Sequence, residues 1–212
     1  MLQIRWHGHA CFEITNKVVI VTDPHDGKSI GIPVPSVTGD IILVSHDHYD
    51  HNSVKTVEKD DSAVVRDVGR RKVEEVTIEG IPSYHDEVQG GKRGSNIIFK
   101  FTVDDITFCH LGDLGHEPDE ELIAKIGEVD VLFIPVGGTF TIDADGAWRT
   151  FQKINPKIVV PMHYKIPGLS LPISDIDPFL AKSRFKVLHV GNEIDIEKEE
   201  LPDEKEIWVF TL

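Results

Sequence analysis

The chain of 212 residues is 40% hydrophobic and 27% charged, a composition typical of a globular protein that folds as one domain, here residues 1–212. Its apolar runs are shorter than the ~18 to 20 residues that span a membrane, and its first residues lack the pattern of a secretory signal. The formal net charge of -14 disfavours nucleic acid as the main partner, because phosphate groups would be repelled.

The first part of the chain predicts strands followed by a long loop. Residues 2–6, 10–15 and 17–23 are β-rich runs separated by short polar breaks. Residues 24–39 are rich in glycine and proline, and long loops of this kind often carry function. Residues 40–45 form a continuous apolar run, which indicates a strand buried on both faces.

The middle of the chain predicts one helix and a set of short strands. Residues 53–60 have helical spacing after a polar residue that suits a helix N-cap. A hairpin is expected to turn near Asp104 and Asp105. The strands of this part are expected over 63–68, 74–84, 96–103 and 105–111.

The second half alternates helices with strands. Helices are predicted over 118–127, over 144–154 and from Asp177 onward. Strands are expected over 129–137, 157–164, 185–190, 193–197 and 206–212. Two strand-rich portions with interspersed helices predict an α/β (α+β) fold, in which two sheets pack face to face with helices outside as a four-layer αββα sandwich.

The run SHDHYDH at residues 45–51 indicates a metal centre. It places His46, His48, Asp50 and His51 at the end of a buried strand. Alternate residues of an extended segment point the same way, so His46 and His48 can share one ligand position while the other two turn toward a neighbouring one. Imidazole and carboxylate groups suit Zn, Mn or Fe ions.

These residues resemble the signature of the metallo-β-lactamase superfamily, H-x-H-x-D-H, which occurs here as HDHYDH. The resemblance covers nearly the whole chain and implies the metallo-β-lactamase fold. Asp23 matches the early aspartate of that superfamily, His85 the third histidine, Asp113 the bridging acid and His163 the last histidine. Other segments resemble a small branch that includes ascorbate-6-phosphate lactonase-like and other metal-dependent hydrolases.

The resemblance implies two divalent metal ions, with Zn²⁺ expected and Mn²⁺ or Fe²⁺ as alternatives. One ion would be held by His46, His48 and His85, and the other by Asp50, His51 and His163, with Asp113 as the bridge. Two alternatives stay open. His110 can replace His85 as a ligand, and Asp113 can cap the segment that follows it.

Several other residues are candidates for supporting roles. Asp23 is expected to orient a ligand histidine. His9 and Tyr164, together with His7, are predicted to line the substrate pocket, with packing at strand ends as the alternative. Gly137 and Gly138 either let the backbone approach the site or make a turn.

The pocket walls are expected in residues 24–39 and 87–95. In the second segment Lys92 or Arg93 can bind a phosphate or carboxylate of an anionic substrate, or can simply be solvated. Cys11 and Cys109 are too few for a disulfide framework, which indicates a reduced, cytoplasmic protein with buried thiols.

The predicted function is metal-dependent hydrolysis of an ester-like bond, in a lactone, phosphodiester or thioester, within a small molecule. A metal-bridging hydroxide would attack, and Asp50 would orient it as the catalytic residue. The alternatives are a nuclease or phosphodiesterase acting on nucleic acid, and a non-hydrolytic metal-binding or diiron redox protein. No association with a membrane is expected.

Overall fold

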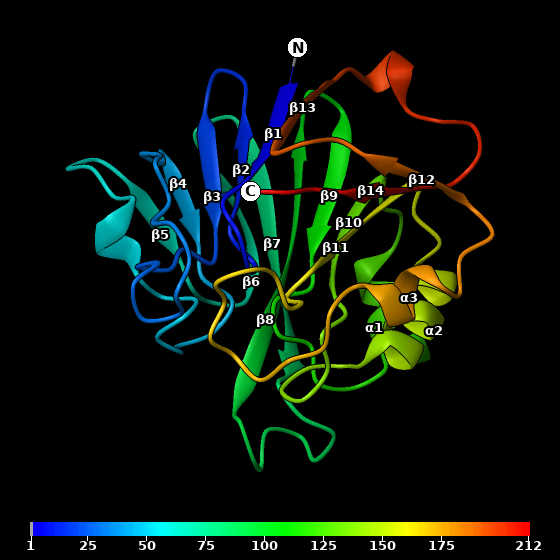
Figure 1. Ribbon diagram of the computed structural model, residues 1–212. Helices are drawn as coiled ribbons and strands as arrows, with labels where there is room; N and C mark the ends of the chain where they lie inside the picture. Colours follow the sequence, from blue (N-terminus) through cyan, green and yellow to red (C-terminus); the bar gives the residue numbers. More distant parts are fainter. Residues whose placement is uncertain (1) are drawn as a thin grey trace.

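Two β-sheets packed face to face form the frame of the protein in the computed structural model, which describes residues 2–212 (Figure 1). The six-stranded sheet consists, in spatial order, of β13 (Glu193–Ile196), β1 (Leu2–Trp6), β2 (Phe12–Thr15), β3 (Val19–Thr22), β4 (Ile41–Leu43) and β5 (Ala63–Val65). The eight-stranded sheet consists of β12 (Lys186–His189), β14 (Glu206–Val209), β11 (Ile158–Met162), β10 (Val131–Pro135), β9 (Ile106–His110), β8 (Ser95–Val103), β7 (Val76–Tyr84) and β6 (Gly69–Val73).

Each sheet has an antiparallel part and a parallel part. The hairpin of β8 and β9 turns at Asp104 and Asp105, as predicted, and both residues have a positive φ. From β9 through β10 and β11 to β14 the strands run parallel, and so do β3, β4 and β5. Parallel strands have their carboxyl ends at the same edge of a sheet, which is where ligands bind in folds of this kind.

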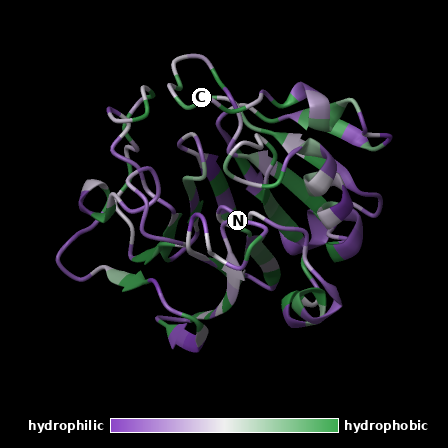
Figure 2. Ribbon diagram, turned by 90° about the horizontal axis from the view of Figure 1, so that it is seen from below, coloured by the Kyte–Doolittle hydropathy of each residue, from purple (hydrophilic) through white to green (hydrophobic). Residues whose placement is uncertain are grey.

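Three α-helices lie beside the eight-stranded sheet (Figure 1). They are α1 (Glu120–Ile126), α2 (Ala144–Ile154) and α3 (Asp177–Leu180). Asp119 and Asp143 cap the first two helices by accepting a backbone N–H at 2.8 Å. In Figure 2 the helices carry both hydrophilic and hydrophobic residues, whereas the strands beside them are largely hydrophobic.

The burial of the strands follows this layering. β1 alternates between buried and half-buried residues, because only one of its faces meets the core. β10 and β11 are buried at every position, because helices cover the face that points away from the other sheet. The rings of Phe12 on β2 and Phe133 on β10 lie 4.4 Å apart between the sheets, and each such buried ring contributes about 1.5–3 kcal/mol. The predicted fold class is thus confirmed.

The outer face of the six-stranded sheet differs from the prediction. The helix expected over 53–60 is a single 3-10 turn, η1 (Val54–Thr56), which covers a small apolar cluster that includes Ile42 and Val57. Three β-branched residues within 54–57 explain this result, because crowding at their Cβ atoms disfavours helix. A second 3-10 turn is η2 (Lys198–Glu200).

Strand β6 was not expected from the sequence. Its residues GRRKV show no apolar alternation, and the strand pairs with β7 alone at the edge of the sheet, where positive charges discourage pairing with another chain. No helix among residues 2–212 has the length and apolar character needed to cross a bilayer.

Candidate metal centre

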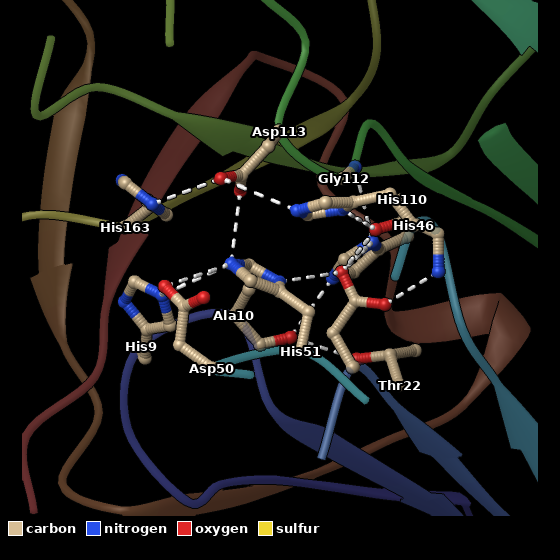
Figure 3. Close-up of polar contacts among 12 residues, drawn as sticks. His9, Ala10, Thr22, His46, Asp50, His51, His110, Gly112, Asp113 and His163 are labelled. Atoms are coloured by element: carbon tan, nitrogen blue, oxygen red, sulfur yellow. Dashed lines mark hydrogen bonds and ion pairs between the residues drawn. The ribbon is translucent and has the colours of Figure 1, made fainter. Parts of the chain in front are cut away.

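The predicted ligands come together at the carboxyl ends of strands from both sheets. Figure 3 shows His46, Asp50, His51, Asp113 and His163 among them. His46 follows β4 of the six-stranded sheet, and the remaining residues of the SHDHYDH run continue from it. His85 follows β7, Asp113 follows β9 and His163 follows β11, all in the eight-stranded sheet. The centre is therefore built where the two sheets meet.

The first group of candidate ligands consists of His46, His48 and His85. The ring centroids lie 4.6 Å apart for His46 and His48, 4.7 Å for His46 and His85 and 5.0 Å for His48 and His85. One nitrogen from each ring lies within 4.8 Å of the other two. An ion with N ligands, such as zinc, can take three such imidazoles and keep a position open.

The second group contains Asp50, His51 and His163, and His9 joins it. The Nε2 atom of His9 lies 3.1 Å from Asp50 Oδ2 and 3.1 Å from His51 Nε2. The ring of His9 lies 4.3 Å from that of His163. His9 is fully buried beneath the ligands. Contrary to the prediction, it is not among the residues that line the cavity.

Asp113 lies between the two groups. Its Oδ2 atom is 3.2 Å from Nε2 of His85 in the first group and 3.1 Å from Nε2 of His163 in the second. Its Oδ1 atom is 3.3 Å from Nε2 of His51. No helix starts at Asp113 in the described chain, since α1 begins seven residues later, so the alternative of a helix cap does not apply.

The chemistry of these atoms fits a bound cation. His46 Nε2, His163 Nε2 and Asp113 Oδ1 are buried, and among the described residues none of them has a partner in hydrogen-bonding geometry, despite the close approaches given above. Leaving such a group unsatisfied costs about 1–3 kcal/mol. Burial, together with the nearby His51, lowers the pKa of His46 to about 3. His46 is therefore neutral, the form that binds a metal.

The groups behind the ligands fix which nitrogen faces the centre. Asp23 is fully buried and accepts hydrogen bonds from Ser45 N at 2.7 Å, Ser45 Oγ at 2.6 Å and His51 Nδ1 at 3.0 Å. Burial alone would raise the pKa of Asp23, but the hydrogen bond and charge interaction with His51, together with the interactions with His110 and His46, outweigh burial and lower it. His46 Nδ1 lies 2.9 Å from Ser45 Oγ. Both imidazoles thus present Nε2 to the centre.

His110 does not face the centre. Its Nε2 atom donates to the carbonyl of Ala10 at 2.9 Å, and its Nδ1 atom accepts the N–H of Gly112 at 3.1 Å. Both ring nitrogens are therefore occupied by the backbone, which leaves His85 as the third histidine of the first group.

Two further predicted pocket residues lie elsewhere. Tyr164 is buried, stacks on Trp6 with a centroid distance of 5.6 Å and donates its hydroxyl to the carbonyl of Phe210 at 3.2 Å. Tyr164 is not among the residues that line the cavity over the ligands, contrary to the prediction, because its ring packs on Trp6 and its hydroxyl is held by the backbone. His7 pairs with Glu13 at 2.9 Å, outside the cavity.

A cavity of about 310 Å³ opens over the ligands His48, Asp50, His85 and Asp113. Its other walls are Tyr49, Arg93, Phe140 and Leu171. Of the two basic residues predicted near the pocket, only Arg93 lines it. A larger hollow of about 730 Å³ lies around Thr107, Asn155 and Lys198 and contains none of the candidate ligands.

Three residues of the cavity wall were not predicted from the sequence: Tyr49, Phe140 and Leu171. Tyr49 lies inside the SHDHYDH run and is 62% exposed, and an exposed aromatic residue beside metal ligands is a signal that the sequence did offer. Phe140 and Leu171 come from two loops that are distant along the chain, so no local pattern predicts their meeting.

The backbone is also unusual at the centre. His9, Asp23 and His163 have φ values of 55°, 37° and 52°, a left-handed region that costs a non-glycine residue about 1 kcal/mol or more. Gly137 lies against His163, whose carbonyl oxygen would be 2.1 Å from a Cβ atom at that position. Of the two alternatives for this glycine, close approach of the backbone is therefore the one observed.

The fold and this cluster define a protein of the metallo-β-lactamase class. A family model described as the beta-lactamase superfamily domain matches residues 3–163. The chain belongs to this superfamily.

Particular relatives narrow the assignment. A UPF0173 metal-dependent hydrolase of Pyrococcus furiosus is 30% identical over 92% of this chain and all of its own length. One of Thermoplasma volcanium is 29% identical over 96% of this chain and 99% of its own length. A solved structure from Thermotoga maritima, described as a Zn-dependent hydrolase of the metallo-β-lactamase superfamily, is 36% identical with a TM-score of 0.82, covering 99% of this chain and 98% of that one. The protein is a metal-dependent hydrolase of this superfamily.

Proposed function

We propose that the protein is a dinuclear hydrolase that cleaves an ester-like bond in a small molecule. The observation that supports this most strongly is the position of Asp113 between two groups of nitrogen ligands, at 3.2 Å from His85 and 3.1 Å from His163. A carboxylate in that position suits a bridge between two ions, which typically lie about 3.5–4 Å apart in two-metal sites.

The candidate residues would have two roles, which are to bind the metal ions and to orient the ligands. His46, His48 and His85 would hold one ion, and Asp50, His51 and His163 would hold the other, with His9 donating to Asp50. Two bound divalent ions would supply Lewis acidity and a water of lowered pKa that serves as the nucleophile near neutral pH.

Asp50 is the residue that would orient the attacking water. One of its oxygens lies 3.1 Å from His9 Nε2, and its side chain also lines the cavity. The carboxylate can therefore be held from behind by His9 while it accepts a hydrogen bond from a water on the cavity side. Burial would raise the pKa of Asp50, but His51 and His9 hold it far below its usual range, so the group accepts rather than donates.

Zinc is the proposed metal, because the ligand set combines imidazole and carboxylate and because the Thermotoga maritima relative is described as Zn-dependent. Cytoplasmic location remains the expectation from the cysteines. Lactones, thioesters and phosphodiesters are the proposed substrate classes, since the cavity opens beside the candidate ligands.

The first test is metal content per chain by elemental analysis, combined with assays on a lactone, a thioester and a phosphodiester. We expect two metals in the wild type, and loss of metal and activity in His48→Ala, Asp113→Ala and His163→Ala. His189→Ala, which removes an exposed histidine of β12, is the matched control and should retain both. Wild type with one metal, or full metal content in Asp113→Ala, would contradict the dinuclear centre.

A further inference from the structure

The loop between β7 and β8 is organised by one buried carboxylate. Asp86, next to the candidate ligand His85, is 1% exposed. Its Oδ1 atom accepts the backbone N–H of Val88 at 2.9 Å and of Gly90 at 2.8 Å. Its Oδ2 atom accepts those of Lys92 at 2.8 Å and Arg93 at 2.7 Å. The backbone of residues 86–93 is thus tied to the residue that follows the ligand.

This arrangement places Arg93 at the cavity. Its Nη2 atom donates to the carbonyl of Thr139 at 3.0 Å, and its guanidinium carbon lies 5.7 Å from the ring centroid of Phe140. Within residues 2–212 it forms no ion pair with a carboxylate at 4.0 Å or less. Its charge is therefore left for a ligand.

Lys92 is in a different situation although it is the adjacent residue. Its ammonium group pairs with Glu87, and its side chain is 56% exposed. It does not line the cavity. The two basic residues of the loop are therefore an internal comparison, one facing the candidate centre and one facing solvent.

The cavity has three chemically distinct parts. The ligands form one wall, Phe140 and Leu171 give an apolar wall, and Arg93 is the one Lys or Arg among the described residues that line it. A net charge of -14 would repel an anionic substrate from most of the surface. A single unpaired guanidinium beside the centre counteracts that repulsion locally.

We propose that Arg93 binds a free carboxylate of the substrate while an apolar or aromatic part of the same molecule packs on Phe140 and Leu171. This inference rests on the proposed function and names its substrate class: a small ester, lactone or thioester that also carries a carboxylate. The planar fork of arginine pairs with a carboxylate through two parallel hydrogen bonds.

A carboxylate fits better than a phosphate monoester. One guanidinium matches one monoanionic carboxylate. The cavity volume of about 310 Å³ is at the lower end of the range for small-molecule sites, which suits a compact acid.

The test measures binding rather than turnover. Calorimetry on the metal-loaded protein would give the dissociation constants of phenylacetate, of its neutral analogue phenylacetamide and of phenyl phosphate. We expect wild type to prefer phenylacetate to the amide, and Arg93→Gln to reduce this preference about 10- to 100-fold, as expected for a charge-assisted hydrogen bond. Arg93→Lys should fall between the two, because it keeps the charge and loses the fork. Lys92→Gln, the matched control, should change the preference less than about 2-fold.

Three outcomes would overturn the proposal: equal effects of Arg93→Gln and Lys92→Gln, no effect of either, or tighter binding of phenyl phosphate than of phenylacetate. Its failure is distinguishable from that of the proposed function. If the loaded protein hydrolyses no ester but loses its preference for phenylacetate in Arg93→Gln, the anion site stands and the hydrolytic proposal falls. If it hydrolyses esters and Arg93→Gln changes no preference, the reverse holds.

Discussion

Replacing Asp23 by asparagine tests whether the groups behind the ligands control the centre. The buried carboxylate accepts three hydrogen bonds, two from Ser45 and one from His51. Asparagine has nearly the same shape but offers one oxygen and one NH₂ group, which is itself a donor. In either orientation of the amide, at least one of the three donors faces another donor.

The structure sets the size of the expected effect. Losing a hydrogen bond to a charged group costs about 1.5–3 kcal/mol, and an unsatisfied buried donor adds about 1–3 kcal/mol. We therefore expect Asp23→Asn to lower the free energy of unfolding by about 2.5–6 kcal/mol in urea titrations of the metal-free protein. Since His51 loses its orienting partner, metal affinity should also fall about 10- to 100-fold in calorimetric titrations.

Asp47→Asn is the matched control. Asp47 lies between His46 and His48 in sequence but is exposed, so the same chemical change should alter stability by less than about 0.5 kcal/mol. If Asp23→Asn behaved like this control in both measurements, the reasoning that the Asp23 network orients His51 would be refuted.

Three further predictions concern pH, packing and metal removal. Burial lowers the pKa of His25 to about 4, so the folded protein keeps it neutral while the unfolded chain takes up a proton below about pH 6.5. Protonation of this group should therefore lower the free energy of unfolding by about 3 kcal/mol between pH 6.5 and 4. Urea titrations of metal-free His25→Gln should show a shallower pH dependence than those of the wild type, and an unchanged slope would count against the assignment. Gly137→Ala should displace the backbone of His163, lower the free energy of unfolding by about 1–3 kcal/mol and weaken metal binding. A metal affinity equal to that of the wild type would show that the contact between residue 137 and the His163 carbonyl relaxes without consequence. When the free metal concentration is about 100 times the dissociation constant, removing the metal with a chelator should lower the melting temperature by about 5–10 °C in calorimetry. Adding Zn²⁺ back should restore the melting temperature. A melting temperature that does not respond to the chelator would argue against a metal bound by both sheets.

The sequence predicted the candidate ligands best where the information is local. His46, His48, Asp50 and His51 occur in one run, and the chain geometry after a strand end brings them together. Asp113 and His163 were predicted from the resemblance to the superfamily, because they lie far along the chain from that run. The choice between His85 and His110 could be made only from the structure, because it depends on which ring nitrogens form hydrogen bonds with the backbone.

The errors have equally specific causes. Tyr164 was assigned to the pocket because it follows the candidate ligand His163, but the left-handed backbone at His163 and the packing of the Tyr164 ring on Trp6 direct it into the core, and no local pattern predicts this. The helix over 53–60 failed because apolar spacing outweighed β-branched propensity in the prediction. Phe140 and Leu171 were missed because their meeting depends on how distant loops fold over the sheets.

The hydrogen bonds of Asp86 have a consequence for how such an enzyme diversifies. The loop between β7 and β8 is held by backbone amides bound to one carboxylate, so these hydrogen bonds do not depend on the side chain at position 93. Mutations at position 93 can then alter chemical preference while leaving the neighbouring histidine in place. Single substitutions at position 93 would then change the substrate preference during evolution without loss of the metal.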